Sequence, residues 1–115
     1  MPMYMTQFAY TPEAWAGLIR SPENRAEAAG ALATKLGARL VDVYFCFGEY
    51  DGVVLYEAPD DTTATAFIVT AITPGHIKAS RTTRLMSISE LQDVLSKAGT
   101  VTYAAPRGMS QAAPA

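Results

Sequence analysis

Two β-forming runs in the middle of the chain stand so close together that they must pair as an antiparallel hairpin. The first covers residues 39–47 and the second covers residues 52–58, and both are rich in β-branched and aromatic side chains. The few residues between them leave no room for a parallel crossover connection, which takes a dozen residues or more. This hairpin therefore sets the antiparallel character of the sheet.

Two registers of the hairpin compete, because a glycine-containing pair of residues stands at each of two turn positions. A turn at residues 48–49 gathers one wholly apolar face, in which Gly52 makes room for a phenylalanine opposite. Its pairs are Phe47 with Tyr50, Phe45 with Gly52, Val43 with Val54, and Val41 with Tyr56. We favour this register because it separates a core face from an amphipathic face, and the turn at residues 51–52 is the alternative.

One strand precedes the hairpin and one follows it, and helical segments separate them from it. A break at Ser21-Pro22 predicts a sharp kink or a short loop in the first helical segment, and Ser21 is the expected cap of its second piece. The expected elements are a strand at residues 3–10, a helical segment at 12–36, the hairpin, a helix from 61 to about 73, a strand at 77–86 and a last helix from the capping box at 87–90 to Gly99. This β-α-β-β-α-β order predicts a ferredoxin-like α+β fold with a four-stranded antiparallel sheet and a C-terminal helix.

The chain has 115 residues, a length typical of one domain. We expect that domain at residues 1–103 and a flexible Ala/Pro-rich tail at residues 104–115. No secretion signal is recognisable, and no apolar run approaches the ~18 residues of a membrane span, so we expect a cytoplasmic protein without a membrane partner. A net charge of −2 argues against nucleic-acid binding.

Three segments of the chain carry a recognisable pattern: Gly48-Glu49-Tyr50-Asp51 with the run that follows to residue 60, the Thr-Pro-Glu start of the first helix, and Pro74-Gly75 with the Thr-Thr-Arg at 82–84. This pattern resembles the GYD domain family. It covers about residues 3–100, and the named Gly, Tyr and Asp of the family correspond to Gly48, Tyr50 and Asp51. The resemblance implies a dimeric α+β barrel-like protein and brings no general activity with it.

One face of the expected sheet stays bare, because the helices cover only the other face. That bare face carries Tyr44, Cys46, Val53 and Leu55. An apolar surface of this kind is usually covered by a partner. We therefore expect a homodimer, or a higher oligomer, that packs through the open sheet face.

Three residues are the catalytic candidates: Tyr50, His76 and Asp51. They offer a hydroxyl donor, the only near-neutral base and a carboxylate, a set suited to proton transfer at pH 7. The alternative is that Tyr50 packs beside Phe47 while the Asp51 carboxylate accepts hydrogen bonds from the turn or from the neighbouring strand. With one histidine and one cysteine in the chain, we expect neither a metal site nor a cofactor.

A second set, Trp15, Tyr4 and Phe8, is the candidate lining of a ligand cavity between helices and sheet. The analogy with dimeric α+β barrel proteins, which the resemblance implies, predicts a cofactor-independent oxygenase or isomerase that acts on a small organic compound. A non-catalytic small-ligand-binding or stress-associated module and a purely structural oligomer are the alternatives. Whether the protein is an enzyme is left open by the sequence.

Overall fold

The computed structural model describes residues 1–109, which divide into a compact unit at Met1–Leu85 and a second unit that begins at Met86. The first unit contains the strands and helices of the expected order. These elements are β1 (Met3–Tyr10), α1 (Pro12–Arg20), α2 (Arg25–Lys35), β2 (Arg39–Phe45), β3 (Gly52–Glu57), α3 (Asp61–Ile72) and β4 (Ile77–Leu85).

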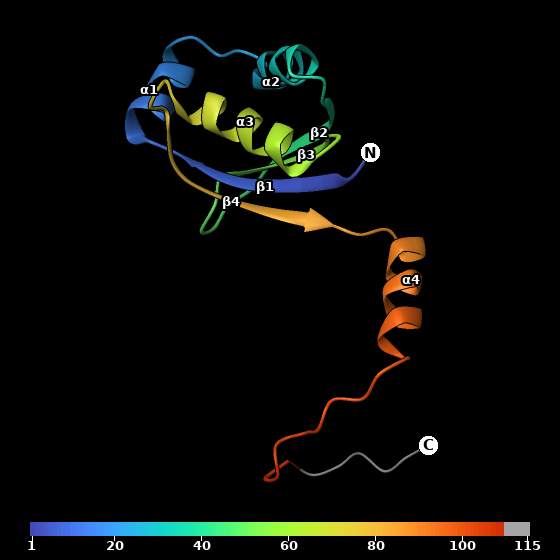
Figure 1. Ribbon diagram of the computed structural model, residues 1–115. Coiled ribbons are helices and arrows are strands. Elements are labelled where there is room, and N and C mark those ends of the chain that lie inside the picture. The colour runs from blue at the N-terminus through green and yellow to red at the C-terminus, as the bar shows by residue number, and fades with distance from the viewer. Residues whose placement is uncertain (110–115) are drawn as a thin grey trace. The chain divides into compact units, whose positions relative to one another are not determined.

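The four strands form one antiparallel sheet in the order β2-β3-β1-β4. Helices α1, α2 and α3 lie on the same side of this sheet, so the first unit has one covered face and one bare face (Figure 1). The architecture confirms the ferredoxin-like α+β prediction.

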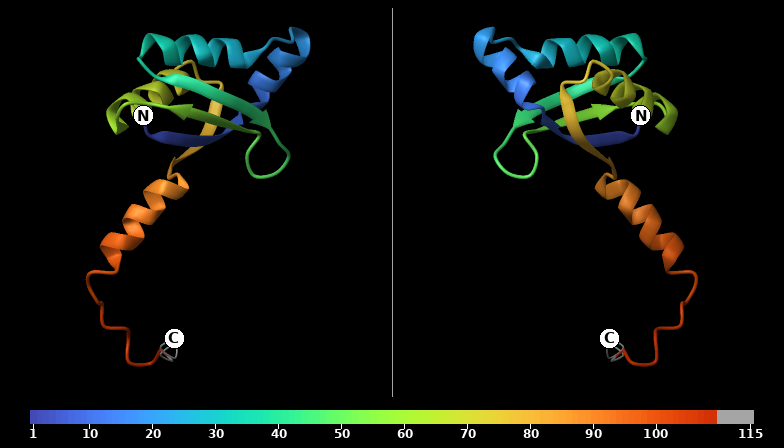
Figure 2. Two further views of the ribbon diagram at one scale, coloured as in Figure 1. Left: turned by 90° about the vertical axis from the view of Figure 1, so that its right-hand side faces the viewer. Right: turned by 90° about the vertical axis from the view of Figure 1, so that its left-hand side faces the viewer.

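The β2–β3 hairpin has the favoured register over its middle part but not the expected two-residue turn. Phe45 lies opposite Gly52 and Val43 opposite Val54, as predicted. The Cys46 N–H donates to the Asp51 carbonyl at 2.8 Å, and residues 47–50 then form an open loop. Figure 2 shows this loop as the rounded green segment at the end of the two strands.

The predicted pair of Val41 with Tyr56 is wrong, because the register shifts between Leu40 and Asp42. Leu40 lies opposite Tyr56 and Asp42 opposite Leu55, so Val41 is the extra residue of a β-bulge. A bulge of this kind leaves no mark in the alternation of apolar residues.

Gly52 makes room for Phe8 rather than for Phe45. A Cβ atom at this position would lie 2.3 Å from Cζ of Phe8, which faces Gly52 from β1. The Phe45 ring instead packs edge-on against Phe8, with 5.9 Å between ring centroids. Glycine is therefore required here by a close approach of side chain to backbone.

The first helical segment is divided into two helices rather than kinked. Ser21 is the C-cap of α1, and its backbone N–H donates to the Gly17 carbonyl. The prediction that Ser21 caps the second helical piece is therefore wrong. Asn24 has that role, since its side chain accepts from the Ala26 N–H at 3.0 Å. The cap therefore lies three residues further along the chain than Ser21.

The packed core lies where β1 and β3 meet α2 and α3. Its buried residues are Tyr4, Ala33, Ala38, Tyr56, Ala58, Ala64 and Phe67. Thr6 is the one buried polar residue of the described chain, and its hydroxyl forms hydrogen bonds with Tyr56 and Thr82 at 2.9 and 2.8 Å. The polar atoms inside this layer are thus paired.

The second unit contains α4 (Ile88–Ala98), which begins with the predicted capping box. Residues 101–109 form neither helix nor strand, and residues 110–115 of the predicted tail lie outside the described residues. The flexibility of the tail and the domain end at residue 103 stay predictions. Within residues 1–109, no helix is both long and apolar enough to cross a bilayer.

Candidate functional site

A cavity of about 210 Å³ lies between the helices and the covered face of the sheet. Residues of β1, β2, β3, β4, α2 and α3 contribute to its wall. They are Thr6, Phe8, Tyr10, Arg25, Ala28, Ala29, Leu32, Val43, Phe45, Val54, Phe67, Ile68, Thr70, Ala71, Ile72, Pro74, His76, Ile77 and Ser80. The cavity is thus mainly apolar, with a few polar side chains, as is usual for small-molecule sites.

The depth of the cavity follows from the exposure of its lining residues. Thr6, Phe8 and Phe67 are buried and form its floor, whereas Phe45 and Ile72 are exposed and belong to its rim. The Thr6 hydroxyl is already paired with Tyr56 and Thr82. The floor therefore offers a ligand apolar contact rather than a free polar group.

Three polar side chains meet at one end of the cavity: Tyr10, Arg25 and His76. The Tyr10 and His76 rings lie 6.0 Å apart between centroids, and the Arg25 guanidinium lies near both of them. The His76 carbonyl accepts from the Thr11 N–H at 3.0 Å, which attaches the loop before β4 to the end of β1. Backbone pairing thus places the histidine beside Tyr10.

The environment shifts the pKa of both ring side chains. Burial raises the pKa of the Tyr10 hydroxyl, although the neighbouring Arg25 acts in the opposite direction. Burial lowers the pKa of His76, and the positive charge of Arg25 lowers it further. At pH 7 this end of the cavity therefore presents a neutral imidazole, a neutral phenol and one cation.

The structure brings one of the three catalytic candidates, His76, to the cavity. Tyr50 is not among the lining residues, and its carbonyl accepts from the Cys46 thiol at 3.2 Å. Asp51 also lies outside the lining, where its Oδ2 accepts from the Tyr10 N–H at 2.8 Å and from the Trp15 indole N–H at 3.3 Å. Asp51 therefore attaches the β2–β3 loop to β1 and α1.

Of the three expected lining residues, Phe8 lies in the cavity wall. Trp15 packs edge-on against Tyr10 from outside, with 5.2 Å between the ring centroids. Tyr4 stacks on Tyr56 in the packed core, and its hydroxyl donates to Oδ1 of Asp61 at 2.6 Å. The sequence thus identified the face of β1 that points toward the helices, but not which residues of that face line the cavity.

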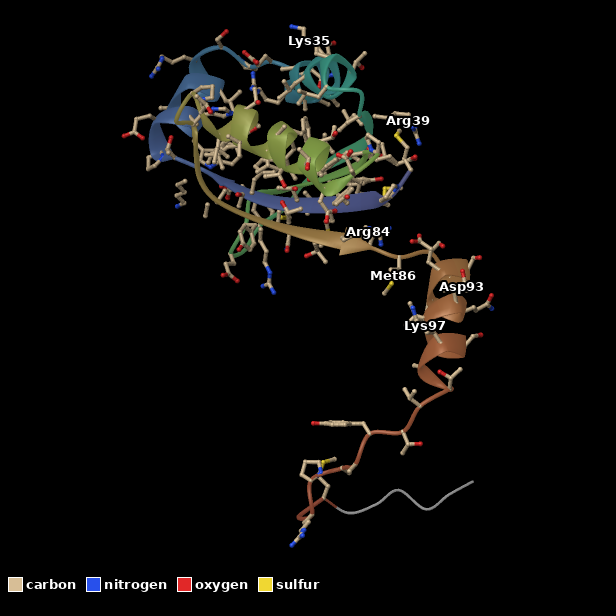
Figure 3. All side chains as sticks on the ribbon, in the orientation of Figure 1. Lys35, Arg39, Arg84, Met86, Asp93 and Lys97 are labelled. Carbon is tan, nitrogen blue, oxygen red and sulfur yellow. The ribbon has the colours of Figure 1, made fainter. Side chains whose placement is uncertain are left out.

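A second hollow of about 400 Å³ lies between α3 and β4 near Tyr4 and Asp61. Most of its wall is exposed surface, including Val69, Thr82 and Arg84, so it is an open groove rather than an enclosed cavity. Figure 3 labels Arg84 near the end of β4. The larger volume therefore belongs to the more open site, and the cavity with the buried floor is the stronger candidate for a ligand.

Two of the three polar side chains that meet at one end of the cavity were missed from the sequence: Tyr10 and Arg25. Tyr10 has the same strand parity as Tyr4 and Phe8, a signal that could have found it. Arg25 is the first residue of α2 and could be placed only with Asn24 recognised as the cap.

Among residues 1–109, no group of three or more His, Cys, Asp or Glu side chains is arranged to hold a metal ion.

The sheet order, the helices on one face and the cavity between them define an α+β protein of the ferredoxin-like class. The chain belongs to the GYD domain family, which matches it over residues 4–95. A comparison with curated proteins gave no match.

Solved structures share this fold at low sequence identity. MtbAldR superposes with a TM-score of 0.54 at 22% identity, over 75% of this chain and 53% of that one, so the chain spans about half the length of MtbAldR. TTHA0845 from Thermus thermophilus gives a TM-score of 0.50 at 17% identity, over 76% of this chain and 95% of that one. An uncharacterized NIPSNAP domain protein from Burkholderia xenovorans gives 0.49 at 17% identity, over 77% and 96% of the two chains. At these identities the likeness to MtbAldR and TTHA0845 shows the fold alone.

Proposed function

We propose that this protein binds a small organic compound in the cavity between its helices and its sheet. The observation that carries the proposal is an apolar cavity of about 210 Å³ with three polar side chains, Tyr10, Arg25 and His76, gathered at one end. A cavity of about 150 Å³ accommodates benzene. The space therefore suits a compound with a single ring and a short polar group.

Binding is tested with p-cresol, a neutral one-ring probe, followed by two-dimensional amide NMR. We expect shifts at amides of lining residues such as Ala71 and His76. The variant Ala71→Leu fills the cavity and should abolish these shifts. The matched variant Ala31→Leu adds the same side chain at an exposed position of α2 and should keep them. Shifts that survive Ala71→Leu, or that map away from the cavity, would contradict the proposal.

A catalytic function is the second candidate, and the position of His76 supports it. The pKa of this imidazole is lowered by burial and by Arg25, so the side chain is a neutral base at pH 7 beside the Tyr10 hydroxyl. Removal of a proton from a carbon acid is a step shared by isomerisation and cofactor-independent oxygenation. Tyr50 and Asp51 remain proposed catalytic residues of lower rank, because His76 alone of the three lines the cavity.

The enzymatic proposal is tested on the enol–keto conversion of phenylpyruvate, followed by the ultraviolet absorbance of the enol. His76→Gln should lower the rate by roughly 10²-fold or more, the usual contribution of a general base. Tyr50→Phe and Asp51→Asn should change it less. A rate equal to the buffer rate would leave a binding protein rather than an enzyme.

A homodimer through the bare sheet face is also proposed. Support comes from Met5, Val53 and Leu55, which no helix of the first unit covers, and from Tyr44, which is 57% exposed on the same face. Leu55→Glu should lower the sedimentation mass to that of one chain, because it would bury an unpaired charge. Ile19→Glu, at a residue of α1 that is 77% exposed, is the matched control and should leave the mass unchanged. The cytoplasmic location stays a prediction.

A further inference from the structure

The charges around the cavity are unevenly distributed. Among its lining residues, Arg25 carries the only permanent charge, and no Asp or Glu is present. The other titratable lining side chains, Tyr10 and His76, are neutral at pH 7. An anionic group that entered this end of the cavity would therefore meet a guanidinium and no carboxylate of the wall.

One carboxylate does contact Arg25, but from the outside. Glu23 precedes α2, and its Oε1 lies 2.5 Å from an Arg25 guanidinium nitrogen. The Glu23 side chain is 52% exposed, compared with 34% for Arg25. An exposed ion pair of this kind contributes little to the stability of the fold. A guanidinium has five N–H donors, so Arg25 can bind a second anion while Glu23 stays in place.

The rest of the cavity determines what must be attached to that anion. Leu32, Val54, Phe67 and Ile68 offer hydrocarbon and aromatic contact away from the polar end. The nearby Thr6 hydroxyl is occupied by Tyr56 and Thr82. A ligand with a charged group at both ends would meet no second charged side chain in the wall.

We propose that the cavity selects compact one-ring carboxylates, and that Arg25 is the residue that determines this selectivity. The inference rests on the proposed binding function and adds the chemical class of the ligand. The carboxylate lies at the Tyr10–Arg25–His76 end, where Arg25 donates charge-assisted hydrogen bonds to it. The ring occupies the apolar part of the cavity.

The test compares benzoate with benzamide, which has nearly the same shape and no charge. Binding is measured by isothermal titration at pH 7.5, and amide NMR confirms that both compounds occupy the cavity. We expect the native protein to bind benzoate about tenfold more tightly than benzamide, because a charge-assisted bond replaces a neutral one. Arg25→Gln should remove this preference by weakening benzoate alone.

Two further variants are controls for a merely structural effect of Arg25→Gln. Arg25→Lys retains the positive charge and should restore part of the preference for benzoate. Glu23→Gln removes the competing carboxylate and should leave benzoate binding equal or tighter. The preference should also decrease at high salt concentration.

The outcomes separate the two proposals. Equal affinities for benzoate and benzamide in the native protein, or an equal loss of both in Arg25→Gln, would overturn the carboxylate assignment while the binding function stands. Failure of benzoate, benzamide and p-cresol alike to shift the cavity amides would overturn both.

Discussion

The two ends of the layer between helices and sheet are built from similar residues but are filled differently. At one end, Ala33 and Ala64 are buried in one cluster with the rings of Tyr4 and Tyr56. At the other end, Ala28, Ala29 and Ala71 face Phe8 and Tyr10, yet about 210 Å³ stays empty. These two ends are called here the packed end and the hollow end.

The difference lies in where the aromatic rings of the sheet are directed. Tyr4 and Tyr56 stack on each other at 5.6 Å, and Phe67 packs against Tyr56 from α3 at 4.8 Å. Tyr10 instead packs on Trp15 at 5.2 Å, and the Phe8 ring packs on Phe45 at 5.9 Å. Small helical residues therefore create a cavity only where the opposing rings pack sideways rather than into the gap.

The largest expected effect separates the two ends by stability. Tyr56→Ala should lower the free energy of unfolding by about 3–5 kcal/mol, because it removes a fully buried ring from the packed end. Phe45→Ala at the rim of the hollow end should cost only about 1 kcal/mol, since that side chain is 52% exposed. Urea unfolding of both variants is the measurement, and equal losses would contradict the distinction.

The next effect concerns the close approach at Gly52. Gly52→Ala should destabilise the protein by about 1–3 kcal/mol, because the new Cβ collides with the Phe8 ring 2.3 Å away. Combining it with Phe8→Leu should cost less than the sum of the two single changes, since the smaller side chain vacates the site. Additive costs in this double-mutant cycle would show that the Phe8 ring is not what the glycine accommodates.

A smaller effect is expected at Asp51, which holds the hollow end in place from outside. Asp51→Ala removes the acceptor of the Tyr10 and Trp15 N–H groups and should cost about 1–2 kcal/mol. Asp51→Asn keeps one carbonyl oxygen and should cost less. The two variants are compared by thermal unfolding. A loss of phenylpyruvate turnover in Asp51→Asn without loss of stability would favour a catalytic role instead.

The smallest effect is the pH dependence contributed by His76. Its pKa is lower in the folded chain than in the unfolded chain, through burial and then Arg25, so the unfolded state binds the proton more readily. This contribution is fully present above the unfolded pKa and is lost as the pH falls from about 7 through the folded pKa. His76→Gln should therefore reduce the decrease in melting temperature between pH 7.5 and pH 5. An unchanged decrease would show that His76 is not responsible.

Much of the fold could be predicted from the sequence because its signals are local. The capping box before α4 and the β1 bounds both depend on neighbouring residues, and both were predicted. The bulge at Val41 and the clash at Gly52 depend on which residue lies opposite. Such contacts are set by pairing between strands rather than by the pattern within one strand.

The site was predictable only in part, for the same reason. Phe8 and His76 were identified by residue type and position, and both line the cavity. Tyr50 and Asp51 were chosen for their hydroxyl and carboxyl groups beside the hairpin turn, yet the contacts of Asp51 stabilise the loop rather than approach the cavity. Arg25 was missed because its placement depends on the break between α1 and α2.

The β-bulge at Val41 has a consequence for how the protein behaves at high concentration. β2 and β4 are the outer strands of the sheet, and an unprotected outer strand invites another chain to add its own strand, the first step toward fibrils. The bulge interrupts the regular hydrogen-bonding edge of β2, while β4 carries Lys78, Arg81 and Arg84 along its length. Both borders of the sheet therefore disfavour strand-by-strand growth, which leaves the bare face as the surface through which the proposed dimer would form.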